Sequence, residues 1–161
     1  MPQDTQVEDG SRDFDFFVGD WTVQNRQLRT RLAGDTEWLE FPGTITMRKI
    51  LNGLGNFDET PIRSPRGAYH GATLRLHNPV AKMWSIYWLD SRNPAIDTPM
   101  VGRFENGIGL FYADELFEGR PIKVRFIWTP ISTTECRWEQ AFSADDGITW
   151  ETNWVADFTR A

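Results

Sequence analysis

Two pairs of side chains have residue types that could transfer protons or stabilise an anion. His70 and Asp90 fall near the ends of two predicted neighbouring strands, where a histidine–carboxylate pair could act as a general base. Arg125 and Glu139 fall on another predicted strand pair. Since no nucleophile or oxyanion donor can be identified beside His70, an ordinary cross-strand ion pair is the simpler interpretation. No residue is therefore assigned a catalytic role.

The sequence offers few ligands for a metal ion. Its only histidines, His70 and His77, are seven residues apart and so point to opposite sides of one strand. Zinc needs three or four converging nitrogen, sulfur or oxygen ligands, and the single cysteine, Cys136, falls on an apolar strand face. A structural role is also a simpler interpretation of either histidine than haem ligation. We therefore expect no metal site, no cofactor and no intrachain disulfide.

Residues 143–150 read SADDGITW, which resembles the Asp-box of sialidases and other β-propellers. In sialidases the motif recurs once per blade and lies away from the catalytic centre, whereas here it occurs once in 161 residues. Asp146-Gly147 and the flanking hydroxyl groups are typical of a tight hairpin turn. The motif therefore predicts a structural hairpin rather than a glycosidase, with Trp150 facing the same way as Trp154.

Turn-forming residues recur about every 8–12 residues, and no stretch has a sustained helical period. Ten strands joined by short turns predict an all-β, antiparallel up-and-down barrel, because closure removes exposed edges; a two-sheet sandwich is the alternative. We expect a flexible segment at 1–12, one barrel domain at 13–161 with a helical turn at 13–18, and an irregular mouth loop at 91–99. The predicted strands cover about 21–30, 37–50, 56–62, 68–77, 83–90, 101–105, 108–117, 122–129, 134–143 and 150–160.

The eight tryptophans indicate which strand faces look inward. Alignment around Asp146-Gly147 places Trp138 near Trp154, on an apolar face whose one polar residue is Gln140. A barrel of this size can enclose a small-molecule cavity, which the tryptophans would line. The inverted arrangement, with Arg75, Arg125, Glu139 and Asn153 inside, stays open at this point. A second hairpin is predicted to place five apolar side chains on one face: Leu74, Leu76, Trp84, Ile86 and Trp88.

The charge and the apolar pattern exclude several classes of partner. A net charge of −6 disfavours nucleic-acid binding, which needs clustered positive charge. No apolar run approaches a membrane span, and the acidic start lacks the apolar core of a signal peptide. We therefore expect a cytoplasmic protein that binds neither nucleic acid nor membranes.

Gly19-Asp20-Trp21, at the start of the first predicted strand after a helical turn, resembles the opening of the calycin superfamily. That superfamily holds the lipocalins, in which an arginine near the end of the barrel packs over this tryptophan; the resemblance implies that role for Arg160. Nearly the whole chain is similar to an uncharacterised bacterial calycin-like family without a settled activity. Nitrobindin-type haem barrels are relatives in fold, but the last two predicted strands lack a histidine. The resemblance to the bacterial family rests on DFDFFVGDW (13–21), WEQAF (138–142) and WETNW (150–154).

These observations predict a binding protein for a small, largely apolar or aromatic ligand held inside the barrel. One alternative is an enzyme that uses the same pocket for proton transfer or anion stabilisation through His70–Asp90 or Arg125–Glu139. Another is an interaction protein that buries a sheet face in a homodimer. The expected ligand-binding residues are Trp84, Trp88, Trp128, Trp138, Gln140, Trp154, His70 and Arg125.

Overall fold

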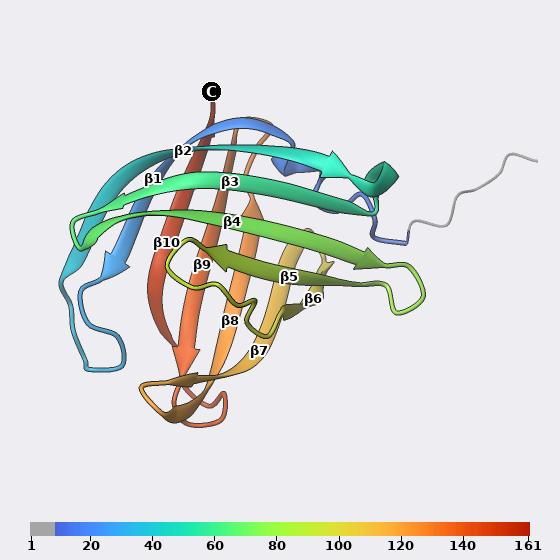
Figure 1. Ribbon diagram of the computed structural model, residues 1–161. Coiled ribbons are helices and arrows are strands. Elements are labelled where there is room, and N and C mark those ends of the chain that lie inside the picture. The colour runs from blue at the N-terminus through green and yellow to red at the C-terminus, as the bar shows by residue number, and fades with distance from the viewer. Residues whose placement is uncertain (1–8) are drawn as a thin grey trace, which may run out of the picture.

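Alternating apolar and polar residues separated by turns fold into ten antiparallel strands in the computed structural model, which describes residues 9–161 (Figure 1). Most of the segment predicted to be flexible, 1–12, lies outside these residues. The strands are β1 (Gly19–Leu28), β2 (Trp38–Ile50), β3 (Gly55–Ser64), β4 (Gly67–Asn78), β5 (Met83–Asp90), β6 (Met100–Glu105), β7 (Ile108–Phe117), β8 (Arg120–Pro130), β9 (Glu135–Ser143) and β10 (Glu151–Arg160).

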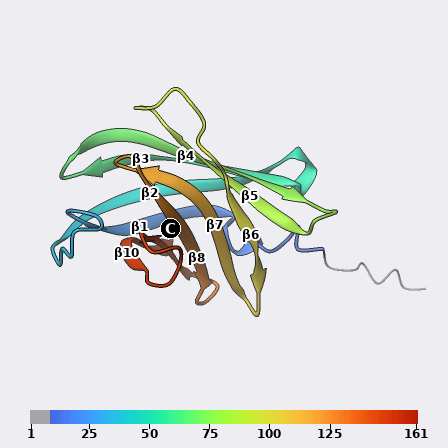
Figure 2. The same cartoon turned by 90° about the horizontal axis from the view of Figure 1, so that it is seen from below.

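The strands form a closed up-and-down barrel, as the sequence predicts, and not a sandwich. Each strand pairs with the next, and β1 pairs with β10 from Trp21↔Arg160 to Gln27↔Trp154, so the sheet has no free edge. In Figure 1, β2 to β5 run across the steeper β7 to β10. The weakest seam is β5–β6, where the ladder ends at Ile86↔Met100 and the chain continues as the loop 91–99 (Figure 2).

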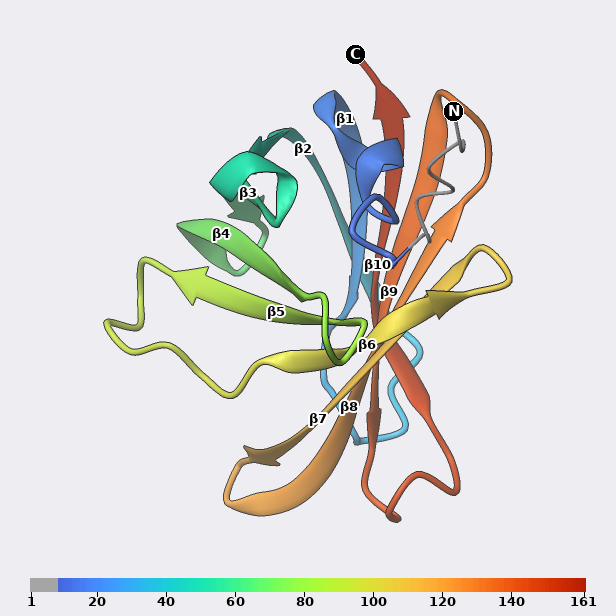
Figure 3. The same cartoon turned by 90° about the vertical axis from the view of Figure 1, so that its right-hand side faces the viewer.

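An aromatic plug closes one end of the barrel. The 3-10 turn η1 (Asp15–Phe17) lies at one end of the barrel (Figure 3). Phe17 and the preceding Phe14 are both buried. We define the aromatic plug by five rings that contact one another: Phe14, Phe17, Trp21, Trp128 and Phe158. Such contacts combine a large buried apolar area with specific ring geometry.

Arg160 covers the plug from outside, as the resemblance to lipocalins implies. Its guanidinium carbon lies 4.1 Å from the centre of the Trp21 ring. It also donates hydrogen bonds to the backbone carbonyls of Phe16, Val18 and Thr133. The other helical element is the 3-10 turn η2 (Leu51–Gly53), and among residues 9–161 no helix is long and apolar enough to cross a membrane.

SADDGITW forms the predicted hairpin turn between β9 and β10. The Asp145 carboxylate accepts hydrogen bonds from the Ser143 hydroxyl and from the backbone and hydroxyl of Thr149, which lowers the pKa of Asp145 to about 2. Asp146 and Gly147 have φ of 61° and 87°, the left-handed region that suits this pair of residues. These contacts are made within the turn, so its role is structural.

The prediction that Trp150 faces the same way as Trp154 is wrong. A β-bulge shifts the β9–β10 register between Thr152 and Trp154, so strand alternation restarts one residue later. Trp150 lies on the outer face, where the guanidinium of Arg125 stacks 4.4 Å from its ring centre. Trp154 points inward, and its ring centre is 5.1 Å from that of Trp138, as predicted.

The predicted inner face of the β4–β5 hairpin is correct for Trp84, Ile86 and Trp88 of β5, but wrong by one residue for β4. Thr73 pairs with Trp88, and Arg75 pairs with Ile86. A one-residue change of register moves every side chain of a strand to the other face. Leu74 and Leu76 therefore face outward, while Arg75 enters the barrel with the tryptophans of β5. The inverted arrangement is thus correct for Arg75, and for Asn153 at the bulge, but not for Arg125 or for Glu139, which lies between the inward-facing Trp138 and Gln140.

Candidate ligand-binding site

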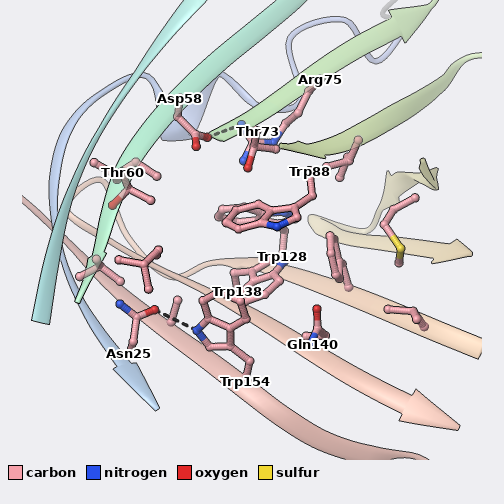
Figure 4. A pocket seen from close by; sticks show the side chains of 18 of the residues that line it. Asn25, Asp58, Thr60, Thr73, Arg75, Trp88, Trp128, Trp138, Gln140 and Trp154 are labelled. Atoms are coloured by element: carbon pink, nitrogen blue, oxygen red, sulfur yellow. Dashed lines mark hydrogen bonds and ion pairs between the residues drawn. The ribbon is translucent and has the colours of Figure 1, made fainter. Parts of the chain in front are cut away.

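A cavity of about 270 Å³ lies inside the barrel above the aromatic plug. Its floor is formed by Phe17, Trp128 and Phe158 of the plug together with Arg75 and Asp58. Its walls are largely apolar, with several tryptophans (Figure 4). Arg92, Asp97 and Thr98 of the loop 91–99 line its mouth. The barrel is therefore hollow in its open half and tightly packed in the half that holds the plug.

The floor holds a buried ion pair. Arg75 and Asp58 are 3% and 1% exposed, and Arg75 Nη1 lies 2.6 Å from Asp58 Oδ2 and 2.9 Å from Asn56 Oδ1. Burial raises the pKa of Asp58, and the Arg75 charge opposes that rise. The guanidinium also lies over Phe14 and Phe17 of the plug, at 5.2 and 5.7 Å from their ring centres. The pair is therefore part of the floor and leaves little net charge there.

Three tryptophans form the main wall of the cavity: Trp88, Trp138 and Trp154. Their rings meet edge to face, with Trp154 at 5.1 Å from Trp138 and 6.2 Å from Trp88. Trp154 Nε1 donates to Asn25 Oδ1 at 2.9 Å, so the inner side of β1 orients this indole (Figure 4). Gln140 Nε2 donates in the same way to Asn153 Oδ1. The wall is thus largely apolar, with a few fixed polar groups.

Gly71 makes room for the Trp88 indole. A Cβ atom at this position would lie 2.2 Å from Trp88 Cη2, far inside van der Waals contact. Because β4 carries no side chain at Gly71, Trp88 can lie against the backbone instead of filling the cavity. The cavity therefore depends on this glycine as well as on the aromatic residues.

The mouth carries charged side chains from several loops and strand ends. The Arg92 guanidinium donates two hydrogen bonds to the Asp90 carboxylate and lies 3.5 Å from the centre of the Tyr69 ring. On β7, burial and the nearby charge of Asp97 raise the pKa of Glu115. Arg31 is another charged residue at the mouth, and its guanidinium carbon lies 5.4 Å from the centre of the Phe142 ring.

Of the predicted ligand-binding residues, Trp88, Trp128, Trp138, Gln140 and Trp154 line the cavity. The other three do not. Trp84 is buried below the cavity, where its ring contacts Phe14 and His77. His70 is exposed on the outside of β4, and Arg125 stacks on Trp150 outside β8.

The two predicted proton-transfer pairs are not assembled in residues 9–161. Asp90 lies opposite Gly71 rather than His70, and its carboxylate binds Arg92. Arg125 lies opposite Ala141, whereas Glu139 lies opposite Ile127. No group of three or more His, Cys, Asp or Glu side chains in the described part of the chain could hold a metal ion.

The polar contributors to the site that sequence reasoning missed include Asn25, Asp58 and Arg31. Asn25 follows Trp21 and Val23 at two-residue spacing, so the alternation of β1 could have placed it inside. Asp58 likewise shares parity with Thr60 and Ile62 on β3. Arg31 lies in a loop, where strand alternation carries no information.

No protein-family model and no curated protein matches the chain. Among solved structures, S-type phycobiliprotein lyase CPES from Guillardia theta is similar, with a TM-score of 0.60 at 12% identity over 99% of this chain and 98% of that protein. A de novo designed fluorescence-activating β-barrel has a TM-score of 0.48 at 11% identity, covering 91% of this chain and 95% of the other. The structure of EF1p2_mFAP2b bound to DFHBI has a TM-score of 0.49 at 12% identity, covering 94% of this chain and 99% of the other. The likeness to the lyase shows a shared closed β-barrel fold.

Proposed function

We propose that this protein binds a small, largely apolar or aromatic molecule inside its barrel. The observation that carries the proposal is the cavity of about 270 Å³ walled by Trp88, Trp138 and Trp154. Small-molecule sites are typically concave, mostly apolar and about 300–1,000 Å³ in volume, with a few polar groups that fix orientation. This cavity is close to the lower end of that range and has the same composition.

The wall is already arranged for a planar ring. Trp154 is oriented by Asn25, and Trp88 lies against Gly71, so neither indole needs to be reordered to receive a ligand. A site that is ordered before binding avoids part of the entropic cost of association. An aromatic ligand could add edge-to-face or offset-stacked contacts with these rings.

The enzyme alternative has less support. Its two candidate pairs, His70–Asp90 and Arg125–Glu139, are not formed, and neither Arg125 nor His70 faces the cavity. A shared fold with a lyase is no evidence for a reaction, because function resides in the site and not in the fold. As a further part of the proposal, the chain belongs to the bacterial calycin-like family that it resembles; the contact of Arg160 with Trp21 supports this assignment.

The test is a fluorescence titration with N-phenyl-1-naphthylamine, a neutral aromatic dye that brightens in apolar surroundings. We expect saturable binding of one dye per chain. Trp154→Ala should weaken it by about 0.5–1.5 kcal/mol through the loss of ring contacts.

Trp150→Ala is the matched control, because it removes the same side chain four residues away on the outer face. Its affinity for the dye should equal that of the wild-type protein. The proposal is wrong if the dye does not bind, or if the two substitutions weaken binding equally.

A further inference from the structure

The arginines that line the cavity differ in how their charges are balanced. Arg75 is paired with Asp58 on the floor, and Arg92 is paired with Asp90 at the mouth. Arg31 also lines the cavity but forms no ion pair with any of residues 9–161. It is therefore the one cavity arginine in the described chain without an ion-pair partner.

The Arg31 guanidinium is held in a partly desolvated position. Its Nε is buried and, among the described residues, has no hydrogen-bond partner. Burial lowers the pKa of Arg31, as does the nearby Arg66. A buried guanidinium N–H without an acceptor is costly, which makes an acceptor from a ligand favourable at this point.

The carboxylate that lies near Arg31, that of Glu151, already accepts a hydrogen bond from the backbone. Glu151 is within electrostatic reach of Arg31, but its Oε1 accepts the backbone N–H of Leu32 at 2.7 Å. Arg66, which adds positive charge at this side of the mouth, donates to the carbonyls of Leu28 and Arg29 and so stabilises the same loop. Arg31 is thus presented by a loop that is anchored on both sides.

The opposite side of the mouth is acidic. Glu115 and Asp97 line the cavity there, and burial together with Asp97 raises the pKa of Glu115. Negative charge at Glu115 and Asp97, and at Glu151 beside Arg31, would repel a dianion such as a phosphate monoester more strongly than a monoanion. A carboxylate also matches the planar fork of a guanidinium.

We infer that the ligand is an aromatic carboxylic acid, with its ring among the wall tryptophans and its carboxylate on Arg31 at the mouth. This inference rests on the proposed function and adds the chemical class of the ligand and its orientation. The apolar end points toward the floor, where the Arg75–Asp58 pair is already neutralised.

The test compares 2-naphthoate with 2-naphthamide, which have the same ring system and nearly the same shape but differ in charge. Binding of each is measured by calorimetry at neutral pH and low salt. We expect the wild-type protein to bind naphthoate about tenfold or more tightly than naphthamide, as befits a charge-assisted hydrogen bond. Arg31→Gln should abolish that preference, with the affinity for naphthoate falling to about that for naphthamide.

Arg29→Gln is the matched control, because it removes the same charge from the same loop. Arg29 is paired with Glu37 and is exposed, so its replacement should preserve the preference for naphthoate. Arg31→Lys, which keeps the charge but loses the planar fork, should retain only part of the preference. This variant gives a second measurement should Arg31→Gln fail to fold.

Several results would overturn the inference. Equal binding of the two probes by the wild-type protein, or an unchanged preference in Arg31→Gln, would exclude Arg31 as the carboxylate-binding group. A folded Arg31→Gln protein that loses both probes would show that Arg31 shapes the pocket instead. Binding of naphthamide alone would leave the proposed function in place, whereas binding of neither probe would contradict both.

Discussion

The two halves of the barrel both contain many aromatic side chains, but use them for different purposes. In the aromatic plug the rings are almost fully buried; Phe17 is 0% exposed and Trp21 is 1% exposed. In the cavity wall, Trp88, Trp138 and Trp154 are only partly buried, and each presents a ring to empty space. Buried ring contacts stabilise the fold, while unfilled ring surface is available to a ligand. Aromatic content alone therefore does not distinguish core from site; the packing around each ring does.

The largest expected effect separates these two halves directly. Phe17→Ala should lower the free energy of unfolding by about 3–5 kcal/mol, because it leaves a void among fully packed rings. Trp138→Ala should cost less, since the Trp138 side chain is only partly buried whereas that of Phe17 is fully buried. Urea unfolding of both variants gives the comparison. Equal losses would show that the wall is packed as tightly as the plug.

A second prediction concerns the boundary between the halves. Asp58→Asn leaves the Arg75 charge buried without its counter-ion and should cost about 3 kcal/mol, near the lower end for a broken buried pair, because the amide oxygen can still accept a hydrogen bond. Replacing both residues, as in Asp58→Asn with Arg75→Met, should recover part of the loss. If the double variant is less stable than Asp58→Asn alone, Arg75 is held by the plug rather than by Asp58.

The smallest predicted effect lies at the mouth and depends on pH. Burial and Asp97 raise the pKa of Glu115 above its ordinary value of 4.5, so the folded state holds this proton more tightly than the unfolded state does. As pH rises from 4.5 through the pKa of the folded state, ionisation increasingly disfavours folding. Glu115→Gln should therefore be more stable than the wild-type protein at about pH 7 but not at about pH 4, as measured by thermal unfolding. The same stability difference at both pH values would contradict a raised pKa.

Most of the fold could be predicted from the sequence. Turn residues such as Asn106-Gly107 mark the strand ends, and the predicted strand over 108–117 matches β7. Register was harder to predict. The loop between Asn78 and Met83 includes Lys82 at φ of 55°, and its length pairs Gly71, not His70, with Asp90. One extra residue in this turn therefore reverses the predicted facing of every β4 side chain, including Arg75.

The site could be predicted only in part, for the same reason. Trp88, Trp138 and Trp154 were identified because apolar alternation marks an inner face. The bulge at Asn153 is invisible to alternation, since an extra residue changes parity without changing composition. Arg31 lies outside any strand, so only the folded loop shows that it reaches the cavity.

The central claim is that the open half of the barrel receives a ring among its tryptophans. A crystal structure of the protein grown with 2-naphthoate tests it most directly. We expect the naphthalene ring between Trp88, Trp138 and Trp154, with its carboxylate directed toward Arg31. A naphthoate bound only on the outer face, or a cavity filled by rotated tryptophan side chains, would contradict the account.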